Sequence, residues 1–382
     1  MGFHEFSSPY DWSRIAAYKR TAKAAFGGMI DLSVGSPVDP VPDSVRKALA
    51  VAANDPNAYG YPATAGTADL RAAIAEWFSA ARNVDLQAIH ADVVPTVGSK
   101  EGVALMASLL HFGEDDVVVQ PKVSYPTYEI GTQLAGAQVL KVDDVADVAS
   151  WRNVPGVKAV WVNSPCNPTG EVYSAERMAG IVAAAREIGA VVLSDECYAL
   201  MQWRGATNSA DNDPLQSTPC ALRSDVCAGS AEGVLVLYSL SKQSNMAGYR
   251  TAFIAGDESL IASMSAYRKQ IGQIIPGPVQ AAMAAGLRDL ESVKVQHARY
   301  RERLGVLVSA LRAYGYCTDM PDGALYVWVR AKSGDCWTDM EQLAKIGIIA
   351  SPGEFYGAPE CLRFSATASD EAIASAAERL VR

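Results

Sequence analysis

One lysine of this chain follows a hydrophobic run, stands between hydroxyl groups and lies close to an arginine. Lys242 follows the apolar run Val234–Tyr238, with Ser239 and Ser241 before it and Arg250 eight residues after it. Most lysines are solvated surface charges, so the residue type alone carries little weight. An amine placed just past a strand end, near hydroxyls and a fixed cation, is suited to a Schiff base with an aldehyde cofactor that carries a phosphate. We therefore predict that Lys242 holds such a cofactor.

A carboxylate stands at the end of another apolar run. Asp195 ends the segment Val191–Asp195, and Tyr198 follows three residues later. An aspartate in this position can simply cap the next helix. Pyridoxal phosphate (PLP), however, needs a buried carboxylate beside its pyridine nitrogen, because the protonated ring stabilises the substrate carbanion. On this second interpretation Asp195 binds the ring nitrogen, and Tyr198 donates a hydrogen bond to the phenolic oxygen of the ring.

Two junctions between strands and the following segments supply further polar groups. The stretch Asn163–Gly170 packs prolines and asparagines behind a strand, which is typical of a turn, but the Asn167 amide is also suited to the cofactor's phenolic oxygen and the substrate carboxylate. The stretch Val97–Gly102 passes from a strand into a helix, so the backbone N–H groups of Ser99 and Lys100 are expected at a helix N-terminus. Such an end binds phosphate well, although many similar turns bind nothing.

Two other residues each have a structural and a functional interpretation. Tyr125 follows a strand, where an aromatic ring either packs in the core or stacks on the pyridine ring. Arg363 has apolar neighbours, so its guanidinium is either an ion-pair partner within the fold or a bidentate clamp for a substrate carboxylate. Together with the anion-binding set Ser239, Ser241 and Arg250, these residues favour the clamp.

The sequence predicts that an α/β fold positions these residues. Short β-branched runs alternate with amphipathic helical stretches between residues 90 and 256, which predicts a mainly parallel sheet covered by helices on both faces. In open α/β sheets the ligand binds beyond the carboxyl ends of the strands, where the candidate residues stand. The expected strands are Val93–Val97, Asp116–Gln120, Ala159–Asn163, Ala190–Asp195, Val234–Tyr238 and Thr251–Ala255.

A second, smaller α/β domain is expected from the two ends of the chain. Residues 278–314 are rich in Ala, Leu, Arg and Glu and predict long helices, followed by the strand-like stretch 323–329 and a final helix from about Ser369. We assign residues 1–45 and 286–382 to the small domain and residues 46–285 to the large PLP-binding domain. Between Trp203 and Gly233 the polar, proline-containing sequence predicts a long surface excursion.

The net charge and apolar content of the chain limit the kinds of binding partner that we expect. The net charge of −9 argues against nucleic acid and anionic membranes, and the chain has no apolar run of spanning length, so we expect small-molecule substrates and no membrane segment. The first residues lack a signal-peptide pattern, which predicts a cytoplasmic protein. The seven cysteines are odd in number and show no Cys-x-x-Cys spacing, and the four histidines lie far apart. We predict no metal and mostly buried cysteines.

In this order the motifs resemble those of fold-type I PLP aminotransferases of class I/II. The resemblance covers nearly the whole chain through the stretches Leu32–Pro37, Tyr61–Gly66, Asn163–Gly170, Asp195–Tyr198, Ser239–Arg250 and Pro352–Gly357 ahead of Arg363. It implies a seven-stranded type of sheet and a homodimer with shared active sites. It also implies that Tyr61 reaches the phosphate in the neighbouring subunit, that Gly35 touches the substrate carboxylate, and that glutamate and 2-oxoglutarate form one substrate pair.

Within that family the chain looks most like actinobacterial succinyldiaminopimelate transaminases of lysine and diaminopimelate biosynthesis. This finer resemblance is carried by the stretches Asp31–Pro40, Val123–Glu129 and Pro276–Met283. Aspartate or other amino-acid aminotransferases share most of the catalytic set, and a carbon–sulfur β-lyase has the same fold with a different outcome. A transcription regulator is disfavoured because only about 30 residues precede Leu32, and a nicotinamide dehydrogenase because no Gly-x-Gly-x-x-Gly follows an early strand.

Overall fold

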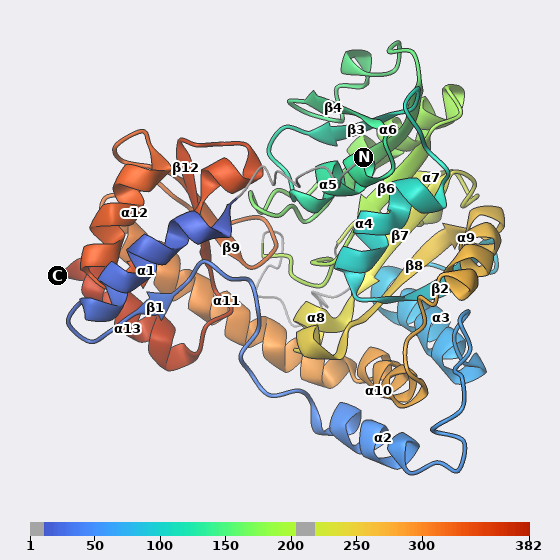
Figure 1. Cartoon of the computed structure of the whole chain (residues 1–382), viewed down its shortest axis with the longest axis horizontal. Coiled ribbons are helices and arrows are strands. Elements are labelled where there is room, and N and C mark those ends of the chain that lie inside the picture. Colours follow the sequence, from blue (N-terminus) through green and yellow to red (C-terminus); the bar gives the residue numbers. More distant parts are fainter. Residues whose placement is uncertain (1–10, 204–217) are drawn as a thin grey trace, which may run out of the picture.

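The larger part of the molecule is built on a seven-stranded sheet. The computed structural model describes residues 11–203 and 218–382. The strand order is β2-β8-β7-β6-β5-β3-β4, and all neighbours are parallel except β8, which runs antiparallel to β2 and β7 (Figure 1). The bounds are β2 (Ala91–Val97), β3 (Val117–Pro121), β4 (Gln138–Val142), β5 (Val157–Asn163), β6 (Val191–Asp195), β7 (Val234–Ser239) and β8 (Thr251–Asp257).

Helices cover both faces of this sheet, which explains why its central strands are apolar throughout. In β7, Val234, Val236 and Tyr238 enter one hydrophobic cluster, whereas Leu235 and Leu237 enter another. Side chains alternate between the faces of a strand, so the two clusters lie on opposite faces. The first cluster includes α3 (Ala68–Arg82), α6 (Ala175–Glu187), α7 (Ser224–Cys227) and α10 (Gly277–Arg288), and the second includes α4 (Ser99–Leu109), α5 (Thr127–Leu134) and α9 (Glu258–Gln270). We call this part the large lobe.

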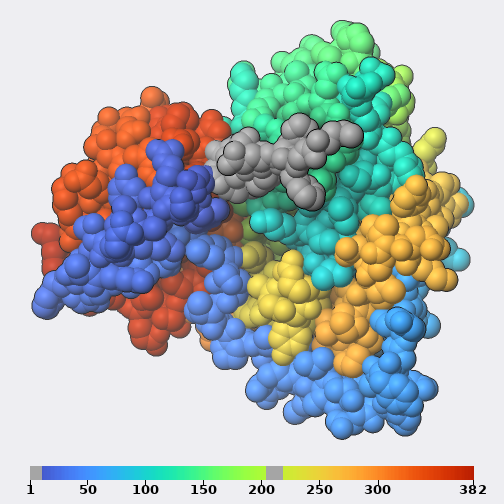
Figure 2. All heavy atoms as spheres, viewed as in Figure 1, coloured from blue at the N-terminus to red at the C-terminus, as the bar shows by residue number. Residues whose placement is uncertain are grey.

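A separate hydrophobic cluster joins the N-terminal segment to the C-terminal third of the chain, and we call this part the small lobe. Ile15 and Leu32 pack there with residues from helices and strands far along the sequence, and Figure 2 shows the blue N-terminal segment lying against the red C-terminal part. The elements are α1 (Ile15–Ala24), β1 (Ile30–Asp31), β9 (Tyr326–Arg330), α12 (Cys336–Lys345), β10 (Ile348–Ile349), β11 (Ser351–Pro352), β12 (Cys361–Ser365) and α13 (Asp370–Val381). β1 pairs with β10, and β11, β12 and β9 form an antiparallel sheet.

One long helix connects the two lobes. α11 (Leu290–Ala313) contributes Val293 to the large-lobe cluster and Leu304 and Leu307 to the small-lobe cluster. α2 (Asp43–Ala53) belongs with the large lobe, since Val45 packs in that core. The expected domain limits at residues 45 and 285 stay a prediction.

The six expected strands are all present, each with limits within two residues of those expected. The sequence analysis missed β4, a partly exposed edge strand whose residues Gln138–Val142 lack a continuous apolar run. The helical region 278–314 is two helices, because the Asp289 carboxylate accepts a hydrogen bond from the Ser292 amide at 3.0 Å and caps α11.

The predicted surface excursion between Trp203 and Gly233 is wrong for its second half. Residues 204–217 lie outside the described residues, but Leu222 is buried in the large-lobe core, and so is Val226, which belongs to α7. The polar composition of the segment between Trp203 and Gly233 obscured these buried apolar residues. Five of the seven cysteines are buried, as expected. In residues 11–203 and 218–382, no helix is long and apolar enough to cross a membrane.

Candidate active site

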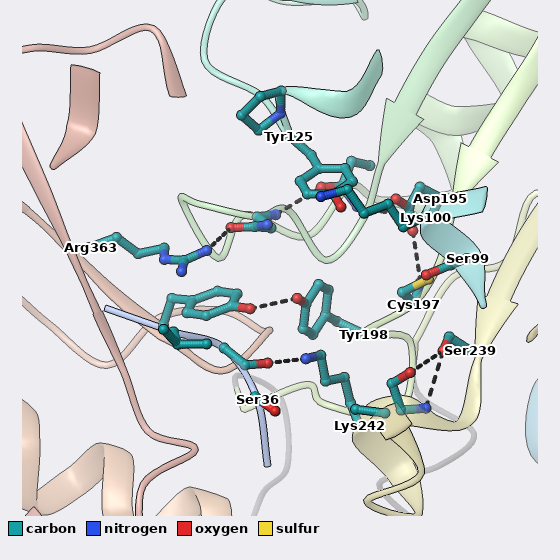
Figure 3. Close-up of a pocket in the computed structure, with 18 of the residues that line it drawn as sticks. Ser36, Ser99, Lys100, Tyr125, Asp195, Cys197, Tyr198, Ser239, Lys242 and Arg363 are labelled. Atoms are coloured by element: carbon teal, nitrogen blue, oxygen red, sulfur yellow. Dashed lines mark hydrogen bonds between the residues drawn. The ribbon is translucent and has the colours of Figure 1, made fainter. Parts of the chain in front are cut away.

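The predicted site residues meet in one pocket between the two lobes. The pocket has a volume of about 330 Å³ and lies at the carboxyl ends of β5, β6 and β7, where Asn163, Asp195 and Ser239 stand. All of the predicted residues except Tyr61 line it: Gly35, Ser99, Lys100, Tyr125, Asn167, Asp195, Tyr198, Ser239, Ser241, Lys242, Arg250 and Arg363. Figure 3 shows Lys242 and Arg363 on different sides of the pocket, with the Tyr198 ring near its centre.

Lys242 is held by the short helix that follows β7. In α8 (Leu240–Gln243) the Ser239 hydroxyl accepts a hydrogen bond from the Ser241 amide at 3.1 Å, which fixes the first turn. The Lys242 ammonium donates to the carbonyl oxygen of Gly35, from the small lobe. Burial lowers the pKa of the Lys242 amine, since an apolar surrounding disfavours its charged form. A larger fraction is then neutral and able to attack an aldehyde.

Asp195 is a buried carboxylate with two neutral donors. Its oxygens accept hydrogen bonds from the Tyr128 hydroxyl at 2.8 Å and from the Cys197 amide at 3.1 Å. Burial raises the pKa of the Asp195 carboxyl. Among the described residues it forms no salt bridge, so its charge is not neutralised by the chain itself. A protonated pyridine nitrogen would neutralise this buried charge. A carboxylate that only caps a helix needs no such burial.

The ends of α4 and α8 form an anion-binding corner. Ser99 begins α4 after Gly98, whose φ of 77° places it in the left-handed region, and a side chain at Gly98 would overlap the Arg250 guanidinium. The hydroxyls of Ser239 and Ser241 lie 2.7 Å apart beside this turn. Backbone N–H groups, two hydroxyls and a guanidinium therefore converge as a phosphate group requires.

Arg363 points into the pocket from β12 of the small lobe. It is 4% exposed, and its guanidinium donates to the Asn167 side-chain oxygen at 2.7 Å and to the Ser33 carbonyl at 2.8 Å. Its Nε is buried without a hydrogen-bond partner, and it forms no salt bridge with an acidic residue of the described chain. A structural ion pair is therefore excluded for these residues, and a substrate carboxylate is the fitting partner.

The remaining predicted residues have different surroundings. The ring of Tyr125 lies edge-on to that of Tyr128, with 5.6 Å between centroids, and Figure 3 shows Tyr125 on the same side of the pocket as Lys100 and Asp195. Tyr61 is fully exposed and lies away from the pocket of its own chain. Its predicted role belongs to a neighbouring subunit and stays a prediction.

Several pocket residues were not found from the sequence. Trp12, Tyr326, Phe355 and Tyr356 are aromatic residues of the small lobe, and their neighbours in sequence gave no sign that they reach the strand ends. Cys197 also lines the pocket, and burial raises the pKa of its thiol well above the usual value, so it stays neutral. In the described part of the chain, no group of His, Cys, Asp or Glu side chains is arranged to hold a metal ion.

The chemistry of this donor set fits PLP. Lys242 supplies the amine, Asp195 an unneutralised buried carboxylate, and the corner at Ser99 and Arg250 an anion site. These are the groups required by an aldehyde, a pyridine nitrogen and a phosphate, in that order.

Comparison with known proteins agrees with this geometry. A model of the family described as aminotransferase class I and II matches residues 27–380. A 4-dedimethylamino-4-oxo-anhydrotetracycline transaminase of Streptomyces rimosus is 40% identical over 97% of this chain and 98% of its own. A probable aminotransferase of Mycobacterium tuberculosis is 39% identical over 97% of this chain and 84% of its own.

A solved structure extends the match to three dimensions. A probable N-succinyldiaminopimelate aminotransferase from Thermus thermophilus superposes with a TM-score of 0.82 at 28% identity, covering 97% of this chain and 99% of that chain. The chain therefore belongs to the class I and II aminotransferases, and it is a PLP-dependent enzyme that moves amino groups between amino acids and 2-oxo acids.

Proposed function

We propose that this aminotransferase uses glutamate and 2-oxoglutarate as one substrate pair and N-succinyl-LL-2,6-diaminopimelate with its oxo acid as the other. One observation carries this proposal: two separate cations, Arg363 and Lys100, face the same pocket, and neither forms a salt bridge with a described residue. The backbone of Lys100 belongs to the anion-binding corner, but its side chain is free to meet a second carboxylate. Both glutamate and the succinyl substrate carry a carboxylate distant from the reacting carbon.

The residues divide the work of the reaction between them. Arg363 binds the α-carboxylate and, with Asn167, fixes the substrate so that its Cα–H bond faces Lys242. PLP held at this site would supply an electron sink for the pair released when that bond breaks. The Lys242 amine takes the proton from Cα and delivers it to the carbon that receives the amino group, as a general base and then a general acid. Asp195 would hold the proton on the ring nitrogen, and Tyr198 would donate a hydrogen bond to the phenolic oxygen.

A donor screen tests the substrate. The holoenzyme is mixed with 2-oxoglutarate and, in turn, N-succinyl-LL-2,6-diaminopimelate, aspartate and aromatic amino acids, and glutamate formation is measured. We expect the succinyl substrate to give the highest kcat/KM. A far better turnover of aspartate or an aromatic amino acid would contradict the assignment. Release of ammonia and pyruvate from an amino acid with sulfur on its β-carbon, added without a 2-oxo acid, would instead indicate a carbon–sulfur β-lyase.

Lys100 provides a sharper test of the distal contact. Lys100→Gln removes the charge and leaves a slightly shorter, neutral side chain, so KM should rise about tenfold or more for substrates with a second carboxylate, since a charged hydrogen bond contributes about 1.5–3 kcal/mol. An amino acid without that carboxylate should be affected far less. Equal losses for both kinds of substrate would place the Lys100 side chain on the cofactor instead.

A second candidate is a bulky oxo substrate such as the one named for the Streptomyces rimosus relative. It is favoured by a pair of aromatic side chains at the pocket: the rings of Trp12 and Phe355 lie 5.1 Å apart, and Trp12 is 44% exposed. A flat apolar substrate would cover such a surface. Including a polycyclic ketone with glutamate as donor in the same screen separates the two candidates.

We further propose a cytoplasmic homodimer in which Tyr61 of each subunit reaches the phosphate site of the other. Tyr61 is fully exposed in the single chain, which agrees with an interface role. Sedimentation should give a dimer, and Tyr61→Phe should weaken PLP binding without changing the dimer. A monomer with full activity would contradict this proposal.

A further inference from the structure

Tyr326 lies next to three residues already assigned to the site, Tyr198, Arg363 and Gly35. It belongs to β9 of the small lobe and is 2% exposed. Its hydroxyl oxygen lies 2.6 Å from that of Tyr198, and its ring face lies under the Arg363 guanidinium, with 4.0 Å from the guanidinium carbon to the ring centroid. Figure 3 shows the hydrogen bond that ends on Tyr198.

Gly35 shows how closely Tyr326 is fitted into this position. A Cβ at residue 35 would overlap the Tyr326 hydroxyl, so the backbone of residue 35 leaves room for that phenol only because it is glycine. The carbonyl of the same Gly35 accepts the hydrogen bond of Lys242. Tyr326 is therefore enclosed by the groups that bind the cofactor and the substrate carboxylate.

The direction of the hydrogen bond between the two phenols follows from the role of Tyr198. Each hydroxyl has one proton to donate. If Tyr198 gives its proton to the phenolic oxygen of the cofactor ring, then Tyr326 must be the donor of the bond between them. A phenol that accepts a hydrogen bond becomes a stronger donor, because hydrogen bonds in a chain polarise one another.

We propose that Tyr326 is a positioning residue that donates to Tyr198 and thereby strengthens the hydrogen bond from Tyr198 to the cofactor, while its ring orients Arg363. The proposal depends on the assignment of Tyr198 and not on the identity of the substrate. It couples the carboxylate clamp of the small lobe to the cofactor site of the large lobe through one side chain. The two effects can be tested separately, because the hydroxyl contacts Tyr198 and the ring contacts Arg363.

The hydroxyl is tested by the pH dependence of the holoenzyme's visible absorbance. The chromophore formed with Lys242 loses a proton as the pH rises, and a donor to the ring oxygen stabilises the deprotonated form. Removing a donor therefore moves the midpoint to higher pH. We expect Tyr198→Phe to raise it by about one unit and Tyr326→Phe by about half a unit, the smaller shift reflecting its indirect action.

A double variant distinguishes a relay through Tyr198 from an independent effect. When Tyr198 is already phenylalanine, adding Tyr326→Phe should move the midpoint no further. Tyr356→Phe is the matched control: Tyr356 also lies near Arg363, at 4.8 Å, but its hydroxyl pairs with Ser351 at 3.2 Å, so the midpoint should stay in place. A general structural disturbance would affect both tyrosines and the melting temperature without this pattern.

The ring is tested by kinetics with glutamate. Tyr326→Phe keeps the aromatic face and should leave KM within about twofold, whereas Tyr326→Leu removes it and should raise KM about fivefold. An unchanged midpoint in Tyr326→Phe, together with a shift in Tyr198→Phe, would overturn the relay but leave Tyr198 in its role. No shift in Tyr198→Phe would remove the premise and overturn the proposal with it. Additive shifts in the double variant would also overturn it.

Discussion

Removing the guanidinium of Arg82 should cost far more stability than removing an exposed arginine. Arg82 ends α3, and Glu196 directly follows Asp195; their side chains are 0% and 1% exposed, with 2.9 Å between Nη2 and Oε2. The same guanidinium donates to the carbonyl oxygen of Pro219 at 2.7 Å. The pair therefore ties the turn behind the cofactor site to the helix layer beneath it.

The size of the effect follows from what Arg82→Met leaves behind. The methionine fills much of the aliphatic volume, but Glu196 is left with neutral donors, among them the Ser194 hydroxyl at 3.0 Å and the Ala221 amide at 2.8 Å. An unpaired buried charge costs about 3–5 kcal/mol, and the unpaired Pro219 carbonyl about 1 kcal/mol more. We therefore expect the free energy of unfolding to fall by about 4–6 kcal/mol.

Urea unfolding followed by tryptophan fluorescence measures this loss. Arg288→Met is the matched control: Arg288 also forms two ion pairs, with Glu76 at 2.7 Å and Asp69 at 2.8 Å, but it is 39% exposed, so its loss should cost about 1 kcal/mol or less. Adding Glu196→Gln to Arg82→Met removes the stranded charge and should restore about 2 kcal/mol. If Arg82→Met were no less stable than Arg288→Met, the argument from burial would be refuted.

Three further predictions concern the active site. Borohydride reduction of the holoenzyme followed by peptide mapping should find the cofactor on Lys242 and not on Lys100, because burial lowers the pKa of Lys242 whereas Lys100 is exposed; label on Lys100 would contradict the mechanism. Arg363→Lys should raise the KM for glutamate about 10–100-fold, since a lysine cannot replace a bidentate guanidinium. Steady-state kinetics measures this change, and an unchanged KM would contradict the proposed contact between Arg363 and the substrate carboxylate. Gly35→Ala should displace Tyr326 and raise the absorbance midpoint as Tyr326→Phe does; an unchanged midpoint would show that the phenol adapts.

The sequence predicted those parts of the fold that are encoded locally. Strands β6 and β7 are buried on both faces, so their residues had to be continuous apolar runs, and the polar residues that follow them marked the strand ends. β4 was not predicted because Gln138 and Lys141 are exposed at the edge of the sheet, which interrupts the apolar pattern. Its stability comes from pairing with β3, which the local sequence does not reveal.

The candidate site was predictable where a residue type and its place along a strand coincide. Lys242 and Asp195 follow buried strands, so the topology of the sheet brings them together. Tyr326 and Trp12 reach the same pocket only because the small lobe folds against the large one, through a core that joins residues near both ends of the chain. Nothing in their neighbouring residues distinguishes them from aromatic residues that simply fill a core.

This division of the pocket has a consequence for specificity. The groups that suit PLP, including Lys242 and Asp195, come from the large lobe, whereas Arg363, Tyr326 and Trp12 come from the small lobe. The cofactor site can therefore be kept while the substrate side varies, which is how relatives with differently named substrates share one fold. In the proposed mechanism Arg363 binds the α-carboxylate that every amino-acid substrate carries, so it would not discriminate among them. Discrimination must come from residues beyond that carboxylate, and Lys100 and Trp12 are the charged and the aromatic candidates that the pocket offers.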